Sequence, residues 1–204
     1  MKKIALIGSK KLSEQLCHYI ESEHFGSICG LFDDFEKAGT VKFDKTILGK
    51  TDQIPEFYRE GLFDAVLIAA GYEHRKFRED IYGYLRENQI PLETFIHPSS
   101  YIDKTAVVKE GTIVLINCIV DMHVVLHENV FLSSNCLLSH HVTIGGHTYL
   151  GPSVSVAGDV EVGKRCFLGI NTTCIDGITI GNNVQTAAGS VITEHIPSDV
   201  LVAG

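Results

Sequence analysis

The sequence predicts two folds in one chain: an α/β domain with a small, Rossmann-like parallel sheet at residues 1–97, and a left-handed parallel β-helix at residues 98–204. Patterns typical of strands and helices alternate through the first part. In the second part Leu, Ile or Val recurs at fourteen of the sixteen positions spaced six apart from Ile102 to Ile192. A period of six residues is the signature of a parallel β-helix.

The first part is expected to contain four strands and three helices. Apolar runs predict strands at residues 3–8, 27–32, 63–70 and 92–96. Apolar residues at helical spacing predict helices at residues 12–23 and 73–88, and Ile54-Pro55-Glu56 begins a shorter one. This alternation implies a parallel sheet with right-handed crossovers. The segment His97-Pro98-Ser99-Ser100 joins this domain to the β-helix.

The strand ends of the first part form a candidate binding site, because ligands of such sheets bind at the carboxyl ends of the strands. The residues at these ends are Gly8, Ser9, Asp33, Asp34, Gly71 and Tyr72. Only the first glycine of the dinucleotide motif GxGxxG is present, which disfavours NAD. Two interpretations stay open: a nucleotide site, or a structural one in which Ser9 caps the helix and Asp33-Asp34 is a turn.

The repeat fixes which residues of the β-helix lie next to one another. Each hexad makes a short strand and a corner, three hexads close a coil of eighteen residues, and residues eighteen apart stack. Fourteen of the sixteen repeat positions are Leu, Ile or Val. Glycine follows the repeat position at five places, where we expect a turn with unusual φ. The repeat positions are Ile102, Val108, Val114, Val120, Leu126, Leu132, Leu138, Ile144, Leu150, Val156, Val162, Leu168, Cys174, Ile180, Thr186 and Ile192, and the glycines are at 145, 151, 163, 169 and 181.

Composition excludes several classes of protein. The net charge of −8 and the absence of basic runs argue against nucleic-acid or anionic-membrane binding. No stretch approaches the roughly 20 apolar residues of a membrane span, so we expect a cytoplasmic protein. The six cysteines lack CxxC spacing, which argues against a zinc site or a disulfide framework. Cys118 and Cys136 are eighteen apart and should stack as free thiols in the core.

With these motifs in view, the whole chain resembles the sugar O-acyltransferases related to sialic acid O-acetyltransferase, which include nucleotide-amino-sugar N-acetyltransferases of bacterial surface-glycan biosynthesis. The small α/β domain before the repeats carries part of the resemblance. The rest is carried by three stretches of the repeats: Ser139-His140-His141-Val142-Thr143-Ile144-Gly145, residues 157–171 (AGDVEVGKRCFLGIN) and Ala187-Ala188-Gly189-Ser190-Val191-Ile192.

The resemblance implies an acetyl-CoA-dependent acetyltransferase that works as a homotrimer and needs no metal. His140 would be the general base, and acetyl-CoA would lie near Gly158, Asp176, Gly177 and Gly189 in the groove between neighbouring β-helices. The first domain would hold the nucleotide of the sugar through the six strand-end residues named above. A histidine titrates near working pH, which suits removal of a proton from a sugar amine. The backbone amide of Gly158 is a candidate for stabilising the oxyanion.

Two departures from the family pattern leave alternatives open. The base is typically followed by an acidic residue, but position 141 is a second histidine, so Asp159 on the next coil could supply the carboxylate. The first loop has Lys10-Lys11-Leu12 where the family has a further glycine. The alternatives to nucleotide-amino-sugar N-acetylation are O-acetylation of a sugar or sialic acid, and a catalytically weak β-helix binding module.

Histidines gather in the repeats, at positions 123, 127, 140, 141 and 147. Trimeric β-helices of the carbonic-anhydrase type hold zinc between subunits with three histidines. The offsets here do not match that pattern, so no metal is expected in the reaction. For His140 the structural alternative is a corner residue that packs at the trimer seam.

Overall fold

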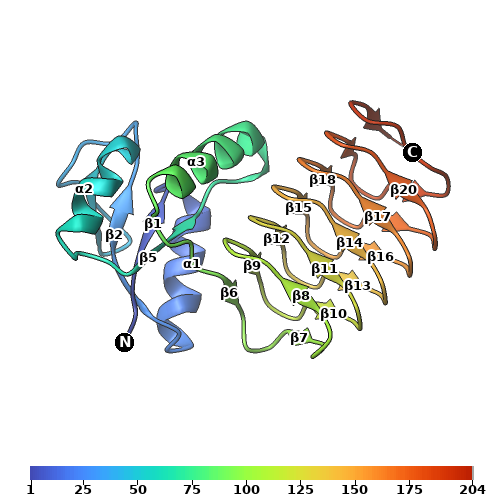
Figure 1. Cartoon of the computed structure of the whole chain (residues 1–204), viewed down its shortest axis with the longest axis horizontal. Helices are drawn as coiled ribbons and strands as arrows, with labels where there is room; N and C mark the ends of the chain where they lie inside the picture. Colours follow the sequence, from blue (N-terminus) through green and yellow to red (C-terminus); the bar gives the residue numbers. More distant parts are fainter. Residues whose placement is uncertain (204) are drawn as a thin grey trace. The chain divides into compact units, whose positions relative to one another are not determined.

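The computed structural model describes residues 1–203, which form two compact units (Figure 1). The first unit is Met1–Glu93 and the second begins at Thr94, four residues before the boundary expected from the sequence. The shift arises because Phe95–Ile96 (β6) pairs with Ile113–Val114 (β9) of the β-helix. Of the strand expected at residues 92–96, Leu92 alone bridges to the sheet of the first unit, through Val66.

The first unit is a five-stranded sheet with helices. Its strands lie in the order β3-β4-β2-β1-β5. The strands are β1 (Lys3–Ile7), β2 (Ser27–Phe32), β3 (Val41–Lys42), β4 (Lys45–Gly49) and β5 (Ala65–Ile68); the helices are α1 (Lys11–Ser22), α2 (Ile54–Arg59) and α3 (Arg75–Glu87), with 3₁₀ turns at Thr51–Gln53 and Tyr72–His74. Strands β4, β2, β1 and β5 are parallel, as expected.

The prediction of a wholly parallel sheet is wrong, because the sheet of the first unit is mixed. Strand β3 runs antiparallel to β4, in a hairpin that apolar patterning did not indicate. The two residues between these strands, Phe43 and Asp44, have φ values of 52° and 58°. A two-residue hairpin turn needs such left-handed conformations, and Asn-Gly is its usual sequence signal. Phe-Asp lacks that signal.

The core of the first unit comes from the apolar runs that predicted its elements. The sheet contributes Ala5, Ile7, Phe32 and Val66, and α3 contributes Ile81 and Leu85. Helix α1 buries Leu16, Cys17 and Ile20, which fall at helical spacing on one face. This packing fixes the strand ends, and with them the predicted binding residues.

The second unit is a β-helix whose strands follow the hexad repeat from Ile102 to Ile192, and only the last strand, Leu201–Val202, departs from it. All sixteen repeat positions are the second residue of a two-residue strand. After β6 and β9, the strands are β7 (Tyr101–Ile102), β8 (Val107–Val108), β10 (Ile119–Val120), β11 (Val125–Leu126), β12 (Phe131–Leu132), β13 (Leu137–Leu138), β14 (Thr143–Ile144), β15 (Tyr149–Leu150), β16 (Ser155–Val156), β17 (Glu161–Val162), β18 (Phe167–Leu168), β19 (Thr173–Cys174), β20 (Thr179–Ile180), β21 (Gln185–Thr186), β22 (Val191–Ile192) and β23 (Leu201–Val202).

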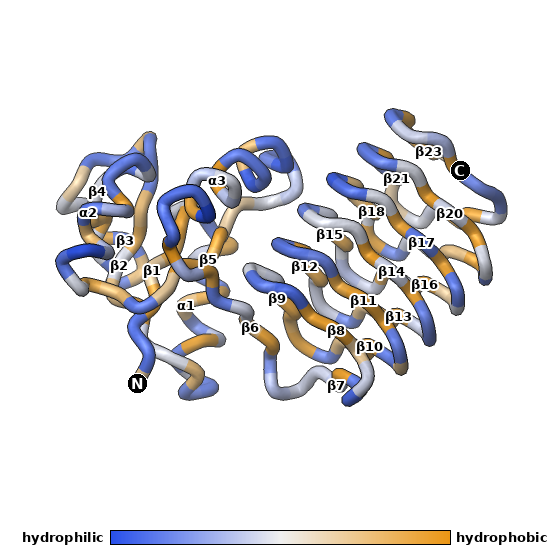
Figure 2. The backbone as a smooth tube through the Cα atoms, viewed as in Figure 1, coloured by the Kyte–Doolittle hydropathy of each residue, from blue (hydrophilic) through white to orange (hydrophobic). Residues whose placement is uncertain are grey.

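These strands form three parallel sheets in which residues eighteen apart are paired, except that β21 and β23 pair residues sixteen apart. Leu138, for example, lies between Val120 and Val156. The repeat positions and the residues two before them fill one continuous core, which includes the free thiols of Cys118 and Cys136. In Figure 2 apolar strand segments alternate with polar corners along most of the coils. The stacking expected from the sequence is therefore confirmed.

The glycines after the repeat positions have a different purpose from the one expected. None of the five has a left-handed φ. Instead, a Cβ added at Gly145 would lie 2.5 Å from the carbonyl carbon of Gly163, so the next coil leaves no room for a side chain. The left-handed residues stand three positions before the repeat position, as at His141 and Asp159. They are mostly Asn, Asp, His and Gly, the residues that tolerate this conformation best.

Candidate active site

The candidate catalytic histidine lies flat against the coil that follows it. A Cβ added at Gly158 would meet Cε1 of His140 at 2.4 Å, Nε2 at 2.8 Å and Nδ1 at 3.0 Å. Only a glycine therefore leaves space for this ring. The side chain of His140 remains 47% exposed, so it can reach a bound substrate. The eighteen-residue register that the sequence predicts thus brings His140 and Gly158 together.

A second histidine and a carboxylate flank the His140 ring. Nδ1 of His141 lies 3.3 Å from Nδ1 of His140. Oδ2 of Asp159 lies 4.0 Å from the same atom of His140, within ion-pair range but beyond a hydrogen bond. The His123 ring packs on His141 with a centroid separation of 4.9 Å. His141 is therefore the nearer of the two groups that can orient His140.

The corner conformation explains why these residue types recur here. His123, His141 and Asp159 have φ values of 59°, 60° and 58°. Each stands where a coil turns in the left-handed region, which favours Asn, Asp, His and Gly. His140, one position earlier, has no such requirement. Backbone geometry alone therefore accounts for His141 but leaves His140 unexplained.

The residues expected to bind acetyl-CoA do not all lie at one corner of the β-helix, and the amides of the three glycines are hydrogen-bonded within the protein. The backbone N–H of Gly158 donates to Oδ1 of Asp176 at 3.1 Å, so this amide is engaged rather than directed at an oxyanion. The N–H groups of Gly177 and Gly189 donate to carbonyls of the preceding coil, at 2.9 Å and 2.8 Å. Asp176 and Gly177 stack one coil beyond Gly158, whereas Gly189 lies at a different corner.

A cavity of about 670 Å³ occupies the strand ends of the first unit. All six predicted residues line it: Gly8, Ser9, Asp33, Asp34, Gly71 and Tyr72. Its wall also includes residues 10–12, at the N-terminus of α1, which receives no side-chain cap among the described residues. Uncapped amides at a helix N-terminus favour an anion such as a phosphate. Sequence reasoning missed Phe35, Thr51, His74 and Phe77, which also line the cavity.

The polar residues of this cavity hold its loops together. Gly8 has a φ of 111° and a Cβ there would meet the Ala69 carbonyl oxygen at 2.9 Å, so this position requires glycine. Ser9 Oγ donates to Oδ2 of Asp33 at 2.6 Å instead of capping α1, and both side chains are buried. Asp33 Oδ1 accepts from the N–H of Phe35. Asp33 therefore ties the first loop to the end of β2.

Asp34 has a similar structural partner. Its Oδ1 accepts from the backbone N–H of Thr51 at 2.8 Å and from Thr51 Oγ1 at 2.9 Å. Asp34 is otherwise exposed. The two aspartates thus shape the rim of the cavity from the side of β2, Asp33 as a buried side chain and Asp34 as an exposed one.

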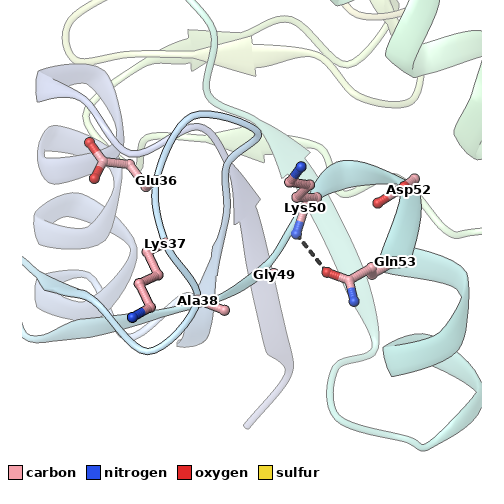
Figure 3. Close-up of a pocket in the computed structure, with 7 residues that line it drawn as sticks. All are labelled: Glu36, Lys37, Ala38, Gly49, Lys50, Asp52 and Gln53. Atoms are coloured by element: carbon pink, nitrogen blue, oxygen red, sulfur yellow. Dashed lines mark hydrogen bonds between the residues drawn. The ribbon is translucent and has the colours of Figure 1, made fainter.

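A second hollow in the same unit, of about 480 Å³, offers no comparable arrangement (Figure 3). Its rim carries Glu36, Lys37, Lys50 and Asp52. The Lys50 N–H donates to Oε1 of Gln53, while Glu36 and Lys37 point away from that pair. No set of reactive groups converges in this hollow.

Comparison with known proteins shows which proteins share this fold. Residues 159–194 match the model of the hexapeptide repeat of succinyl-transferase. A comparison with curated protein sequences finds no match. Among solved structures, PerB from Caulobacter crescentus in complex with CoA and GDP-perosamine superposes with a TM-score of 0.92 at 22% identity, over 100% of this chain and 95% of that one. This chain has the fold of a sugar N-acetyltransferase.

Two further structures agree. A histidine-to-alanine variant of the GDP-perosamine N-acetyltransferase from Caulobacter crescentus, with CoA and GDP-perosamine, has a TM-score of 0.93 at 21% identity, over 100% of this chain and 94% of that one. The acetyltransferase domain of PglB from Neisseria gonorrhoeae FA1090, with acetyl coenzyme A, has a TM-score of 0.88 at 21% identity, over 100% and 96%. The predicted left-handed β-helix and the resemblance in fold are thereby confirmed.

None of the helices in residues 1–203 is long and apolar enough to cross a membrane.

Proposed function

We propose that the chain is an acetyl-CoA-dependent N-acetyltransferase acting on a nucleotide-linked amino sugar, with His140 as general base. The observation that carries this proposal is the His140 ring, seated over Gly158 and flanked by His141 and Asp159 in this fold. Two structures similar in fold contain CoA with GDP-perosamine, and acetyl coenzyme A, respectively. The cavity lined by all six predicted nucleotide-contacting residues supports the same substrate class.

The geometry at His140 suggests which of its two ring nitrogens donates a hydrogen bond and which accepts the proton. A neutral imidazole has one donor and one acceptor nitrogen. We assign the proton to Nδ1, which then donates to Nδ1 of His141, 3.3 Å away. Nε2 of His140 is left as the acceptor. His141 thus takes the orienting role that an acidic residue has in the family, and Asp159 adds negative charge 4.0 Å from the ring.

In the reaction, Nε2 of His140 accepts the proton that the sugar amine loses as its nitrogen attacks the thioester carbonyl. A nitrogen–carbon bond forms and the carbon–sulfur bond breaks, and the histidine returns its proton to the departing thiolate. Since the thioester is already activated, holding the amine and the carbonyl in contact supplies much of the rate gain. The Gly158 amide requires displacement of the Asp176 carboxylate before it can stabilise the oxyanion.

We further propose that the β-helices form a trimer. One outer face carries exposed apolar side chains, Tyr101, Ile119 and Leu137, which are 56%, 45% and 41% exposed in the single chain. Their strands belong to one sheet, and β13 leads directly into His140. A closed ring of three copies would bury this face and place a neighbour beside the catalytic residue. Sedimentation equilibrium should give about 67 kDa, three times the chain mass of 22.4 kDa.

The test measures acetyl transfer to a panel of UDP-, dTDP- and GDP-linked amino sugars. The readout is the release of the CoA thiol from acetyl-CoA. With at least one acceptor, acetyl-CoA should release its thiol and the sugar should gain an acetyl group. This acetyl group should survive treatment with hydroxylamine, because amides resist hydroxylamine and esters do not. The variant His140→Ala should lose this activity, whereas His127→Ala, at a partly buried histidine of another corner, should keep it. Transfer to none of the panel, or full activity of His140→Ala, would contradict the proposal.

A further inference from the structure

The site also contains a set of ligand atoms that the acetyl-transfer reaction does not require. One nitrogen each from His140 and His141 and one carboxylate oxygen from Asp159 lie within 4.8 Å of one another. We propose that these three side chains bind a divalent transition-metal ion such as Zn²⁺, and that the bound ion blocks the general base. The second half of this proposal rests on the proposed function, whereas the first does not.

The spacing of the two imidazoles matches a tetrahedral ion. Zinc–nitrogen bonds are about 2.0–2.1 Å long, which sets two nitrogens of a tetrahedral site about 3.3–3.4 Å apart. The two Nδ1 atoms are 3.3 Å apart. The separation of 4.0 Å between Asp159 Oδ2 and His140 Nδ1 exceeds this spacing by about 0.6 Å. Because the Asp159 side chain is 68% exposed, rotation about its own bonds can close the gap.

The backbone beneath the three ligands is held in place. The N–H of His141 donates to the carbonyl of Met122 at 3.0 Å, and the N–H of Asp159 donates to the carbonyl of His140 at 3.1 Å. The His123 ring packs against His141 from the preceding coil. Because the backbone is fixed in this way, ion binding has to order only the side chains, which favours a site over chance proximity.

The charge at this corner also favours a cation. In the column that contains His140, the stacking register places Asp176 and Glu194 on the following coils and a single lysine, Lys104, two coils earlier. Two imidazoles and one carboxylate suit Zn²⁺, Co²⁺, Ni²⁺ or Cu²⁺, whereas Mg²⁺ and Ca²⁺ prefer sites made of oxygen alone. The fourth position of a tetrahedral ion is left for water.

Metal binding has a direct chemical consequence for His140. An ion on Nδ1 requires the neutral ring to carry its proton on Nε2. The atom that accepts the proton of the amine then becomes a donor, so the base is lost without any change in the fold. The ion takes the place of the Nδ1 proton shared by the two histidines, and that proton moves to Nε2 of the same ring.

Binding is tested with Zn²⁺ by isothermal titration calorimetry and with Co²⁺ by its visible absorption, on the full chain. We expect one ion per chain, and intense d–d bands typical of a tetrahedral site. His141→Ala and Asp159→Asn should each weaken binding at least tenfold, and Mg²⁺ in excess should not compete. His127→Ala is the matched control, because His127 is a surface histidine 3.7 Å from Glu128. Equal affinity in all four proteins would show adventitious surface binding and overturn the site.

Inhibition is tested separately, on acetyl transfer by the wild-type protein. Zn²⁺ should inhibit with a midpoint equal to its dissociation constant, and a chelator should restore the activity. Binding at the three residues without inhibition would overturn the link to the base and leave the metal site standing. If the protein transferred acetyl to no acceptor, the calorimetry would still decide the metal site, so the two failures are distinguishable.

Discussion

Replacing Gly158 by alanine should abolish most of the activity while leaving the fold nearly intact. The added Cβ would lie 2.4 Å from Cε1 of His140, whereas ordinary contacts begin at 3.4 Å. The ring must therefore move by about 1 Å (3.4 − 2.4), and a misplacement of this size can cost 10²-fold in rate. We expect kcat/KM to fall about 100-fold, which corresponds to about 2.7 kcal/mol of transition-state stabilisation.

Stability should change little, because the backbone at Gly158 is not in the left-handed region and the displaced ring is half exposed. A destabilisation below about 1 kcal/mol would lower the Tm by no more than about 2–4 °C. Gly146→Ala is the matched control: it stands at the same position of another hexad, and its Cβ would meet the Glu128 carboxylate at 2.5 Å. It should keep activity within about twofold by the thiol-release assay. Unchanged kcat/KM in Gly158→Ala, or equal losses in both variants, would refute the role assigned to the His140 ring.

Three further predictions concern the core, the thiols and the cavity. Leu138→Ala should lower the free energy of unfolding by about 2–5 kcal/mol, measured by urea denaturation, because Leu138 is fully buried between Val120 and Val156; a loss below 1 kcal/mol would contradict the stacked core. Burial raises the pKa of Cys17 to about 11 and the pKa of Cys174 to about 12, so both thiols remain protonated at pH 8. Both should resist a thiol reagent that labels all six cysteines in denaturant, and rapid labelling of either thiol in the folded protein would contradict this prediction. Ser9→Ala removes the 2.6 Å hydrogen bond to Asp33 and should weaken binding of the sugar nucleotide about tenfold, as measured by calorimetry. Ser22→Ala, on the exposed end of α1, should not weaken it, and equal affinities of the two variants would show that the cavity does not bind the substrate.

The β-helix could be predicted almost completely from the sequence, because each hexad repeats the same physical requirement. An inward side chain at Leu138 must fit between those at Val120 and Val156, so the period, the register and the core all follow from one pattern. The same register predicted that His140 would lie over Gly158. The reason for the glycines did not follow from it: at Gly145 the approach of the next coil, and not φ, excludes a side chain.

The α/β unit was less predictable, since its details depend on contacts between segments distant in sequence. The hydrogen bond between Ser9 and Asp33 joins residues that only the pairing of β1 with β2 brings together. The β3–β4 hairpin has a turn at Phe43-Asp44 without glycine or asparagine, so no local signal marked it. At the candidate active site, the sequence identified His141 as a departure from the family pattern. Only the structure showed its Nδ1 to be nearer to His140 than the Asp159 carboxylate is.

The most direct test of the central claim, that His140 is the base of an N-acetyltransfer, is a single-turnover measurement with acetyl-CoA and the accepting nucleotide amino sugar. Both substrates should bind the His140→Asn variant with affinities close to those of the wild-type protein, since asparagine occupies similar space without a basic nitrogen. The rate of amide formation, followed by the mass of the product, should fall at least 100-fold, at the lower end of what general-base catalysis contributes. Amide formation at the wild-type rate in this variant would contradict the account.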